Sequence, residues 1–182
     1  MRLRFLSSNN NKTEEVKAIL RPLGIEVIPV ERKLDEIQTQ DIGQLVRDKC
    51  VRAFRLIGRP VFVEHTGLYI DALNGFPGGL TQPFWDAVGA ARVAALFGRD
   101  DARAVARTRV GYCDGCRIHQ FEGEVEGTIA RKPRGDTCEW DCVFVPEGER
   151  KTFAELGRRK NDISMRRKAL DAFAAFLKGE AA

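Results

Sequence analysis

Residues 61–78, VFVEHTGLYIDALNGFPG, decide the fold that we expect. Runs of aliphatic and aromatic side chains bounded by turn residues are typical of strands. We therefore expect a buried strand over residues 59–65 and a further strand over residues 68–73, followed by the turn-rich segment NGFPG. Glu64 and His65 then stand together at the end of a buried strand, and this placement indicates a reactive site.

The rest of the chain alternates between strand and helix patterns around this stretch. The dipeptide Asp114-Gly115 predicts a two-residue turn between two long strands. Further strands are expected over residues 1–6, 24–30 and 140–146, and helices over about residues 12–21, 41–57, 84–97 and 164–178. This order predicts an α/β fold, with a mixed central sheet and helices packed on it.

The composition is that of a globular protein. The 182 residues are 43% hydrophobic and 31% charged, and we expect one domain over residues 1–182. No apolar run approaches the roughly 20 residues of a membrane span, and the N-terminus lacks the apolar core of a signal peptide. Five cysteines, an odd number, fit a reduced compartment. We therefore expect a cytoplasmic protein with no membrane partner.

The net charge of +4 limits the kinds of binding partner that we expect. It is too small to require nucleic acid, and no basic stripe is interleaved with aromatic residues, so we expect no nucleic-acid partner. It is compatible with an anionic small molecule, because basic side chains can line a single cleft.

The segment SSNNNKTEE, which follows the first expected strand, is a candidate anion site. Free N–H groups at a helix start, with a lysine beside them, attract phosphate. Ser7, Asn9 and Lys12 are the candidate ligands. The alternative is a capped helix with a solvated lysine.

Three carboxylates form a candidate metal site. Asp35, Glu36 and Glu64 offer the oxygen ligands that Mg²⁺ prefers, and Mg²⁺ commonly arrives with substrate phosphates. The alternative is a charged surface loop beside one acid at a strand end.

The segment RKPRGDTCEWDC combines a basic loop with a candidate base-binding pair. Arg131, Lys132 and Arg134 surround a Pro and a Gly. Trp140 and Asp141 are suited to stacking on a base and accepting hydrogen bonds from it. The alternatives are a solvated loop and a core tryptophan.

The segment KNDISMRRKAL places cations where a helix begins. Lys160 precedes a helix capped by Ser164, with Arg166 in its first turn. Cations there oppose the helix dipole, which favours a bound anion or a contact with a base. The alternative is ordinary surface charge.

Two close cysteine pairs leave a zinc site open as an alternative. These are Cys113 with Cys116, and Cys138 with Cys142. The competing interpretation makes them small packing residues, and we expect the nearby His119 to be structural.

Taken in order, these pieces resemble the inosine triphosphate pyrophosphatase family, the nucleoside-triphosphate diphosphatases that clear deaminated purine nucleotides. The similarity runs nearly end to end. The matching segments are SSNNNKTEE (Ser7, Asn9, Lys12, Glu15), LDEIQ (Glu36), RDKCVRAF (Lys49), VEHTGLYIDALNGFPG (Glu64, Thr66, Gly67), FEGEVEGTIARKPRG (Arg134), KTFAEL, and KNDISMRRKAL (Lys160, Ser164, Arg166).

The resemblance implies an elongated mixed α/β fold of two lobes, with a nucleotide in the cleft between them, and a homodimer. It implies a reaction in which Mg²⁺ helps to deliver water to the α-phosphorus, releasing a nucleoside monophosphate and pyrophosphate. The residues matched to catalysis are Lys12, Glu64 and His65, and those matched to the metal are Glu36, Glu64 and His65. Those matched to substrate are Ser7, Asn9, Lys12, Lys49, Thr66, Gly67, Arg134, Glu139, Trp140, Asp141, Lys160, Ser164 and Arg166.

The departures from the family pattern cluster in this site. His65 stands where the family has an aspartate that serves as general base and metal partner. Cys138 and Glu139 replace an aromatic residue and a glycine, and Met165 replaces a histidine. The segment Thr81-Gln82-Pro83 replaces the Ser-Ala-Arg of bacterial members.

Three hypotheses follow from these departures. In the first, the enzyme cleaves nucleoside triphosphates with His65 as general base, and the metal is Mg²⁺ or an imidazole-tolerant ion such as Mn²⁺. In the second, Glu139 redirects the enzyme to an amino-bearing or modified base, or the enzyme acts on a different phosphate bond. In the third, the protein binds a nucleotide without turnover.

Overall fold

The computed structural model describes residues 1–99, 102–136 and 139–179. Its strands are β1 (Arg2–Leu6), β2 (Glu26–Val30), β3 (Val61–Ile70), β4 (Pro77–Gly78), β5 (Arg103–Cys113), β6 (Ile118–Ile129) and β7 (Phe144–Pro146). Its α-helices are α1 (Asn10–Leu20), α2 (Ile42–Ile57), α3 (Thr81–Val88), α4 (Ala90–Phe97), α5 (Phe153–Leu156), α6 (Lys160–Ile163) and α7 (Met165–Leu177). Within these ranges, no helix is long and apolar enough to cross a bilayer.

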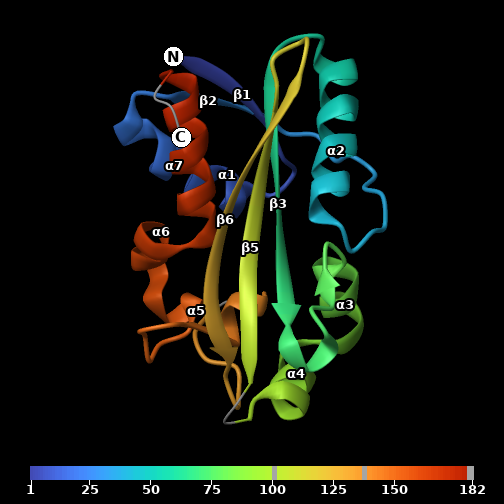
Figure 1. Cartoon of the computed structure of the whole chain (residues 1–182). Coiled ribbons are helices and arrows are strands. Elements are labelled where there is room, and N and C mark those ends of the chain that lie inside the picture. The colour runs from blue at the N-terminus through green and yellow to red at the C-terminus, as the bar shows by residue number, and fades with distance from the viewer. Residues whose placement is uncertain (100–101, 137–138, 180–182) are drawn as a thin grey trace.

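One mixed sheet organises the molecule, as the sequence predicts. The strand order is β2-β1-β3-β5-β6-β7, and β4 pairs with β3 outside this path. β2, β1 and β3 are parallel, whereas β5, β6 and β7 continue the sheet by antiparallel pairing. The long β5–β6 hairpin gives the molecule its elongated shape (Figure 1).

The two strands predicted over residues 59–65 and 68–73 are wrong, because residues 61–70 form the single strand β3 and residues 71–73 form a 3₁₀ turn before β4. β5 pairs with β3 residue by residue, from Val61 with Cys113 to Ile70 with Ala104. This continuous ladder carries β3 straight through its glycine, so Glu64 and His65 lie in the middle of a strand and not at its end.

Three other expectations are corrected. The helix expected over residues 84–97 is two helices, because Gly89 adopts a positive φ of 76° between them. The hairpin loop has four residues instead of two, because the Asp114 carboxylate accepts backbone hydrogen bonds from Cys116 and Arg117. The strand expected over residues 140–146 begins as a 3₁₀ turn and pairs only from Phe144.

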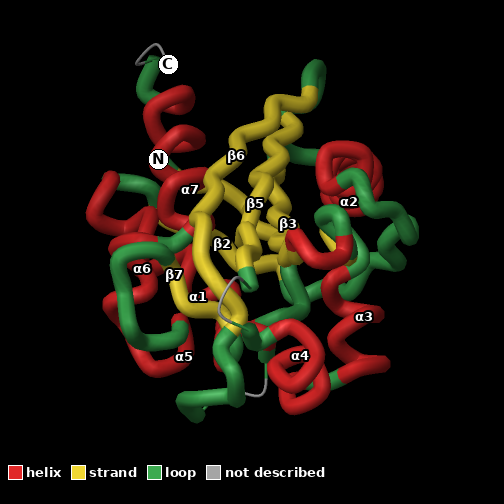
Figure 2. The backbone as a smooth tube through the Cα atoms, turned by 60° about the horizontal axis from the view of Figure 1, so that its bottom comes forward, coloured by secondary structure: helices red, strands yellow, loops and turns green. Residues whose placement is uncertain are grey.

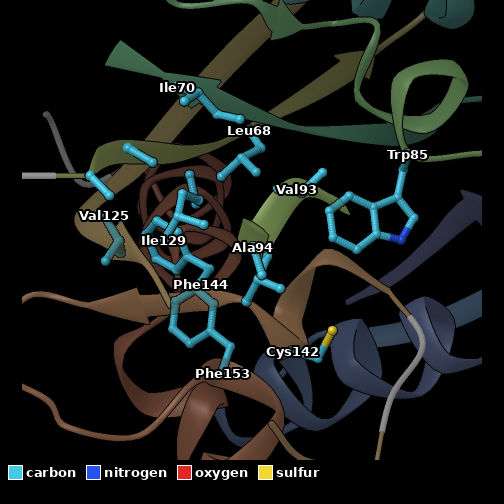
Figure 3. Packing of buried hydrophobic residues seen from close by; sticks show 14 of the residues in the cluster. Leu68, Ile70, Trp85, Val93, Ala94, Val125, Ile129, Cys142, Phe144 and Phe153 are labelled. Carbon is cyan, nitrogen blue, oxygen red and sulfur yellow. The ribbon is translucent and has the colours of Figure 1, made fainter. Parts of the chain in front are cut away.

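Helices cover both faces of the sheet (Figure 2). α1 and α7 bury one face around Phe5, Phe62 and Phe173, and α2 buries the other face around Val46 and Val63. A third cluster lies at the end of the molecule that α3, α4 and α5 enclose (Figures 1 and 3). It includes the side chains of Trp85, Val93, Ile129, Phe144 and Phe153.

The sheet has an opening along one edge of β3. β1 ends at Leu6 and pairs with β3 only at residues 61–62, whereas β4 pairs with it at Leu68 and Tyr69. Between these two contacts, and within the described residues, no strand pairs with that edge of β3. Residues 63–67 of β3 therefore face a space framed by the loops that follow β1 and β2.

Candidate active site

A cavity of about 570 Å³ lies at this opening. It collects side chains from β3, from α2, and from the loops after β1, β2 and β6. The lining includes these residues that the sequence predicted: Ser7, Asn9, Lys12, Glu36, Lys49, His65, Thr66, Glu139, Trp140 and Arg166. Others that the sequence predicted do not line the cavity: Glu64, Gly67, Arg134, Asp141, Lys160 and Ser164.

The loop between β1 and α1 is shaped by its own side chains. The Asn9 amide oxygen accepts from the Lys12 backbone N–H at 3.0 Å, and the Ser7 hydroxyl oxygen accepts from the Asn9 N–H at 3.1 Å. Asn9 is thus the N-cap of α1. The loop is a capped helix start, and it also turns the Lys12 ammonium toward the cavity.

Glu64 lies beneath the cavity and is almost completely buried. One carboxylate oxygen is ion-paired with Lys12, and the other accepts from Arg166 at 3.2 Å and from the Thr66 hydroxyl at 3.1 Å. Burial alone would raise the pKa of Glu64, but the neighbouring Arg166 and Lys12 cations hold that pKa below its usual range. Glu64 is therefore an anion matched to the protein's own cations.

Glu15 extends this pairing from α1 to Lys160 and Asp141. Its carboxylate pairs with Arg166 and lies 3.5 Å from Lys160, whose ammonium donates to Asp141 at 2.7 Å. Lys12, Glu64, Arg166, Glu15, Lys160 and Asp141 form one row of alternating charges, which we call the ion-pair row. Glu15 was matched to the family motif but was not expected to bridge the site.

His65 points to the opposite face of β3, because successive strand residues alternate. Its Nε2 lies 3.1 Å from the Gly79 carbonyl oxygen, and its Nδ1 lies 3.4 Å from a Glu36 carboxylate oxygen. A carbonyl only accepts, so hydrogen-bond logic assigns the proton to Nε2. In the neutral ring, the Nδ1 lone pair then faces a carboxylate. That arrangement suits a cation or a second proton between the two groups.

Glu36 and Lys49 complete this second group. The Lys49 ammonium donates to Glu36 at 2.5 Å and to the Glu64 backbone carbonyl at 3.3 Å. Burial alone would raise the pKa of Glu36, but His65 and Lys49 outweigh it and bring that pKa to about 2. Glu36 is thus an anion at neutral pH at the wall of the cavity.

The three predicted metal ligands do not come together. Glu36 and His65 are neighbours, whereas the Glu64 carboxylate is on the other face of β3 and already carries two cations. Asp35 is exposed on the loop. Among the described residues, no group of three or more His, Cys, Asp or Glu side chains is arranged to hold a metal ion.

One wall of the cavity is built around Trp140. Its ring meets the edges of Phe144 and Phe153 at centroid distances of 5.8 and 6.3 Å, and it also lines the cavity. Ser164 is the N-cap of α7 and accepts from the Arg167 N–H at 3.1 Å. Its structural role is therefore clear from its contacts.

Two glycines and a basic loop have structural contacts. A Cβ on Gly67 would lie 2.6 Å from the Gly78 carbonyl oxygen, so the close approach of β4 requires glycine there. A Cβ on Gly79 would lie 2.3 Å from the Thr39 carbonyl oxygen. Arg134 lies away from the cavity and donates to the Arg150 carbonyl oxygen at 3.2 Å.

The cysteines do not form a shared site among the described residues. Cys113 is buried in the cluster beneath α2, and Cys142 is buried in the cluster at the opposite end of the sheet (Figure 3). Cys116 is exposed in the hairpin loop, and Cys138 lies outside the described residues. His119 pairs with Asp114 at 2.9 Å, which is a structural contact of the hairpin.

Comparisons with known proteins identify the family to which this fold belongs. The model of the Ham1 family matches residues 3–176. The dITP/XTP pyrophosphatase of Methanopyrus kandleri is 39% identical over 186 residues, covering 100% of this chain and 99% of the relative. That of Pyrobaculum aerophilum is 39% identical over 180 residues, covering 97% and 96%. The solved Ham1 protein of Coxiella burnetii has a TM-score of 0.78 at 26% identity, covering 98% and 99%. This protein belongs to the Ham1 family, which confirms the resemblance to the inosine triphosphate pyrophosphatases.

Proposed function

We propose that the protein hydrolyses non-standard purine nucleoside triphosphates, such as dITP and XTP, to the monophosphate and pyrophosphate. One observation carries the proposal: a single cavity joins the β1–α1 loop, the Glu36–His65 pair and the face of Trp140. These are a phosphate site, a reactive pair and an aromatic platform, in that order. The names of the archaeal relatives support the same reaction.

The cations place the triphosphate. Lys12 and Lys49 line the cavity on either side of β3, and each has a carboxylate partner that holds it in position. An incoming phosphate shares these cations with Glu64 and Glu36. Trp140 offers an aromatic face to the purine, and aromatic stacking is typically worth about 1–3 kcal/mol per base.

The residues present fit a divalent cation through Glu36 and the phosphates of the substrate. Mg²⁺ is usually held by one or two carboxylates together with substrate phosphates, and Mn²⁺ accepts similar oxygen ligands. When bound, the ion would neutralise phosphate charge and make a water molecule more acidic. Nδ1 of His65 cannot hold a metal and a proton at once, so we assign the metal to Glu36 and the proton to His65.

His65 then acts as general base at Nδ1. The Gly79 carbonyl keeps a proton on Nε2 and directs Nδ1 toward the cavity wall. Water attacks the α-phosphorus, its proton passes to Nδ1, and the bond from the α-phosphorus to the bridging oxygen breaks. The pyrophosphate departs with that oxygen. Glu36, 3.4 Å away, stabilises the imidazolium that forms.

A product assay tests this proposal. The protein would be incubated with dITP, XTP and the standard triphosphates, with Mg²⁺ or Mn²⁺, and the products separated by chromatography. We expect monophosphate and pyrophosphate, with dITP and XTP preferred. Diphosphate with inorganic phosphate would show a different bond being cleaved, and no product with any substrate would contradict the proposed reaction.

Glu139 supports a second candidate substrate class. Its carboxylate lines the cavity beside Trp140, where the family pattern has a glycine. A carboxylate accepts hydrogen bonds but donates none, so it favours a purine with an amino group. A higher kcat/KM for a 2-amino purine triphosphate than for dITP would support this candidate.

Nucleotide binding without turnover is the remaining candidate, because His65 replaces the expected aspartate. Thermal stabilisation by nucleotide, with no product from any substrate, would support it. The family resemblance also leads us to propose a homodimer, a single domain and a cytoplasmic location. Light scattering of the purified protein would test the dimer.

A further inference from the structure

Two of the cations that line the cavity have no carboxylate partner. Lys12, Lys49 and Arg166 are each ion-paired, as described above. Arg32 and Lys33 also line the cavity and are exposed, and neither side chain makes an ion pair or hydrogen bond with any residue that the structure describes. The free positive charge of this wall therefore lies on these two residues.

The backbone fixes this pair beside the β1–α1 loop. The carbonyl oxygen of Val30, at the end of β2, accepts from the Arg32 N–H at 3.0 Å and from the Ser7 N–H at 3.2 Å. One oxygen thus ties the start of the loop after β2 to the segment that leads into α1. The main chain of Arg32 fixes this part of the loop, and neither side chain is engaged with any described residue, so the charged ends of Arg32 and Lys33 are free to contact a ligand.

The order of the strands places the pair at the far end of the cavity from Trp140. β2 is one edge of the sheet and β7 is the other. Arg32 and Lys33 follow β2, whereas Trp140 immediately precedes β7. A nucleotide whose base stacks on Trp140 must extend its phosphates away from that edge, first past Lys12 and then toward Arg32 and Lys33.

We propose that Arg32 and Lys33 form a second phosphate-binding pair that holds the two terminal phosphates of the substrate, and afterwards the pyrophosphate product. This inference rests on the proposed function. Lys12 and Lys49 are already matched by carboxylates, whereas contacts from Arg32 and Lys33 add charge that the cavity does not otherwise neutralise. The acids that line the cavity are Asp35, Glu36, Asp86 and Glu139, and none of them is ion-paired with the two cations within the described ranges.

A binding experiment with two ligands tests the pair without relying on turnover. The double variant Arg32→Ala/Lys33→Ala would be titrated by calorimetry with inorganic pyrophosphate and, separately, with inosine monophosphate. Two exposed charge contacts of up to about 1 kcal/mol each predict pyrophosphate binding weaker by about tenfold, and by about thirtyfold at most. Inosine monophosphate should bind within about twofold of the unsubstituted protein, because its single phosphate reaches only the first site.

A matched control removes the same charge elsewhere. The variant Arg59→Ala/Arg92→Ala also loses two exposed arginines, and neither residue lines the cavity. It should bind pyrophosphate like the unsubstituted protein. If the control variant binds pyrophosphate as weakly as Arg32→Ala/Lys33→Ala does, the effect is one of overall charge. If Arg32→Ala/Lys33→Ala weakens the binding of pyrophosphate and of inosine monophosphate equally, Arg32 and Lys33 do not hold the terminal phosphates. Either result, unchanged pyrophosphate binding, or no binding by the unsubstituted protein would overturn the inference.

The two proposals fail separately. The product assay decides whether the protein cleaves triphosphates, and the pyrophosphate titration decides where the terminal phosphates bind. A protein without turnover that loses pyrophosphate binding in the Arg32→Ala/Lys33→Ala variant would keep the second phosphate site and lose the reaction. An active protein whose variant binds pyrophosphate normally would keep the reaction and lose the site.

Discussion

Glu64 and His65 are neighbours in sequence, yet they belong to two different environments. Glu64 lies on the face of β3 beneath α1 and α7, buried in the ion-pair row. His65 lies on the face beneath α2, at the wall of the cavity with Glu36. The first environment is a set of matched charges around a fully buried carboxylate, and the second is a partly exposed pair at the cavity wall. Substitutions on the first face should therefore change stability, and those on the second face should change chemistry.

The largest effect should come from Glu64→Gln. The variant leaves Lys12 and Arg166 buried without that counter-charge, and removal of one partner of a buried ion pair typically costs about 3–5 kcal/mol. Urea denaturation would measure the loss in free energy of unfolding. Glu36→Gln is the control, because Glu36 is partly exposed and its loss should cost below about 1 kcal/mol. Equal losses in the two variants would contradict the contrast between the faces.

His65→Asp, on the second face, should raise the catalytic rate without a large change in stability. The carboxylate restores the hard oxygen ligand that Mg²⁺ prefers and a general base at the same position. We expect kcat with Mg²⁺ to rise by about tenfold or more, which is less than the roughly 10²–10⁴-fold attributed to a general base, because His65 already supplies a base in the proposed reaction. Mg²⁺ should also raise the Tm of this variant more than that of the unsubstituted protein, because two carboxylates then face each other across the cation site.

His65→Asn is the control for that prediction, because it keeps a polar side chain but supplies no carboxylate. It should lose activity without gaining the Mg²⁺-dependent rise in Tm. An unchanged rate in His65→Asp would show that position 65 does not take part in catalysis. A large loss of stability in His65→Asn would show that this face is as structural as the Glu64 face.

The fall in the free energy of unfolding at low pH should also differ between variants on the two faces of β3. The pKa of Glu64 is lowered in the folded protein, so the unfolded chain binds more protons and the free energy of unfolding falls as pH falls. This stability is fully present above the unfolded pKa of about 4.3 and is lost below it. Glu36 adds a smaller loss as the pH falls from about 4.3 toward its folded pKa of about 2, because its partly exposed carboxylate is screened by solvent.

Glu64→Gln should reduce the dependence of the free energy of unfolding on pH in the acidic range. Removing one titrating group lowers the slope by up to about 1.4 kcal/mol per pH unit. The measurement is urea denaturation at a series of pH values from neutral down to about 3. An unaltered slope in Glu64→Gln would mean that other carboxylates dominate this dependence on pH. Glu36→Gln should flatten the same region less, because that residue is nearer the solvent.

The sequence could predict the parts of this contrast that depend on local pattern. The helix that carries Lys12, the helix that carries Lys49 and the strand that carries Glu64 all follow from apolar spacing and caps. Strand alternation also implies that Glu64 and His65 point to opposite faces. That rule argues against placing both in one metal site, as the family match did.

The parts that depend on distant segments could not be predicted in this way. β3 continues past Gly67 because β5 pairs with it along its whole length, and β5 lies about 40 residues further along the chain. Glu15 meets Arg166 across 151 positions of sequence. Arg32 and Lys33 reach the cavity because Val30 holds their loop against the segment before α1. No local spacing rule contains these three contacts.

The smallest effect should come from Glu139→Gly, at the part of the cavity that Trp140 lines. Glu139 is exposed, so its carboxylate should alter the preference between bases by about fivefold at most, the equivalent of about 1 kcal/mol. The ratio of kcat/KM for a 2-amino purine triphosphate to that for dITP should fall in this variant. Glu139→Gln keeps the size of the side chain and adds a donor, so it should shift the ratio in the same direction. If both variants leave the ratio unchanged, the base is selected by Trp140 and by the Asp141–Lys160 end of the ion-pair row. In that case the buried charges would serve recognition as well as stability, and the division between the two faces of β3 would hold for the phosphates but not for the base.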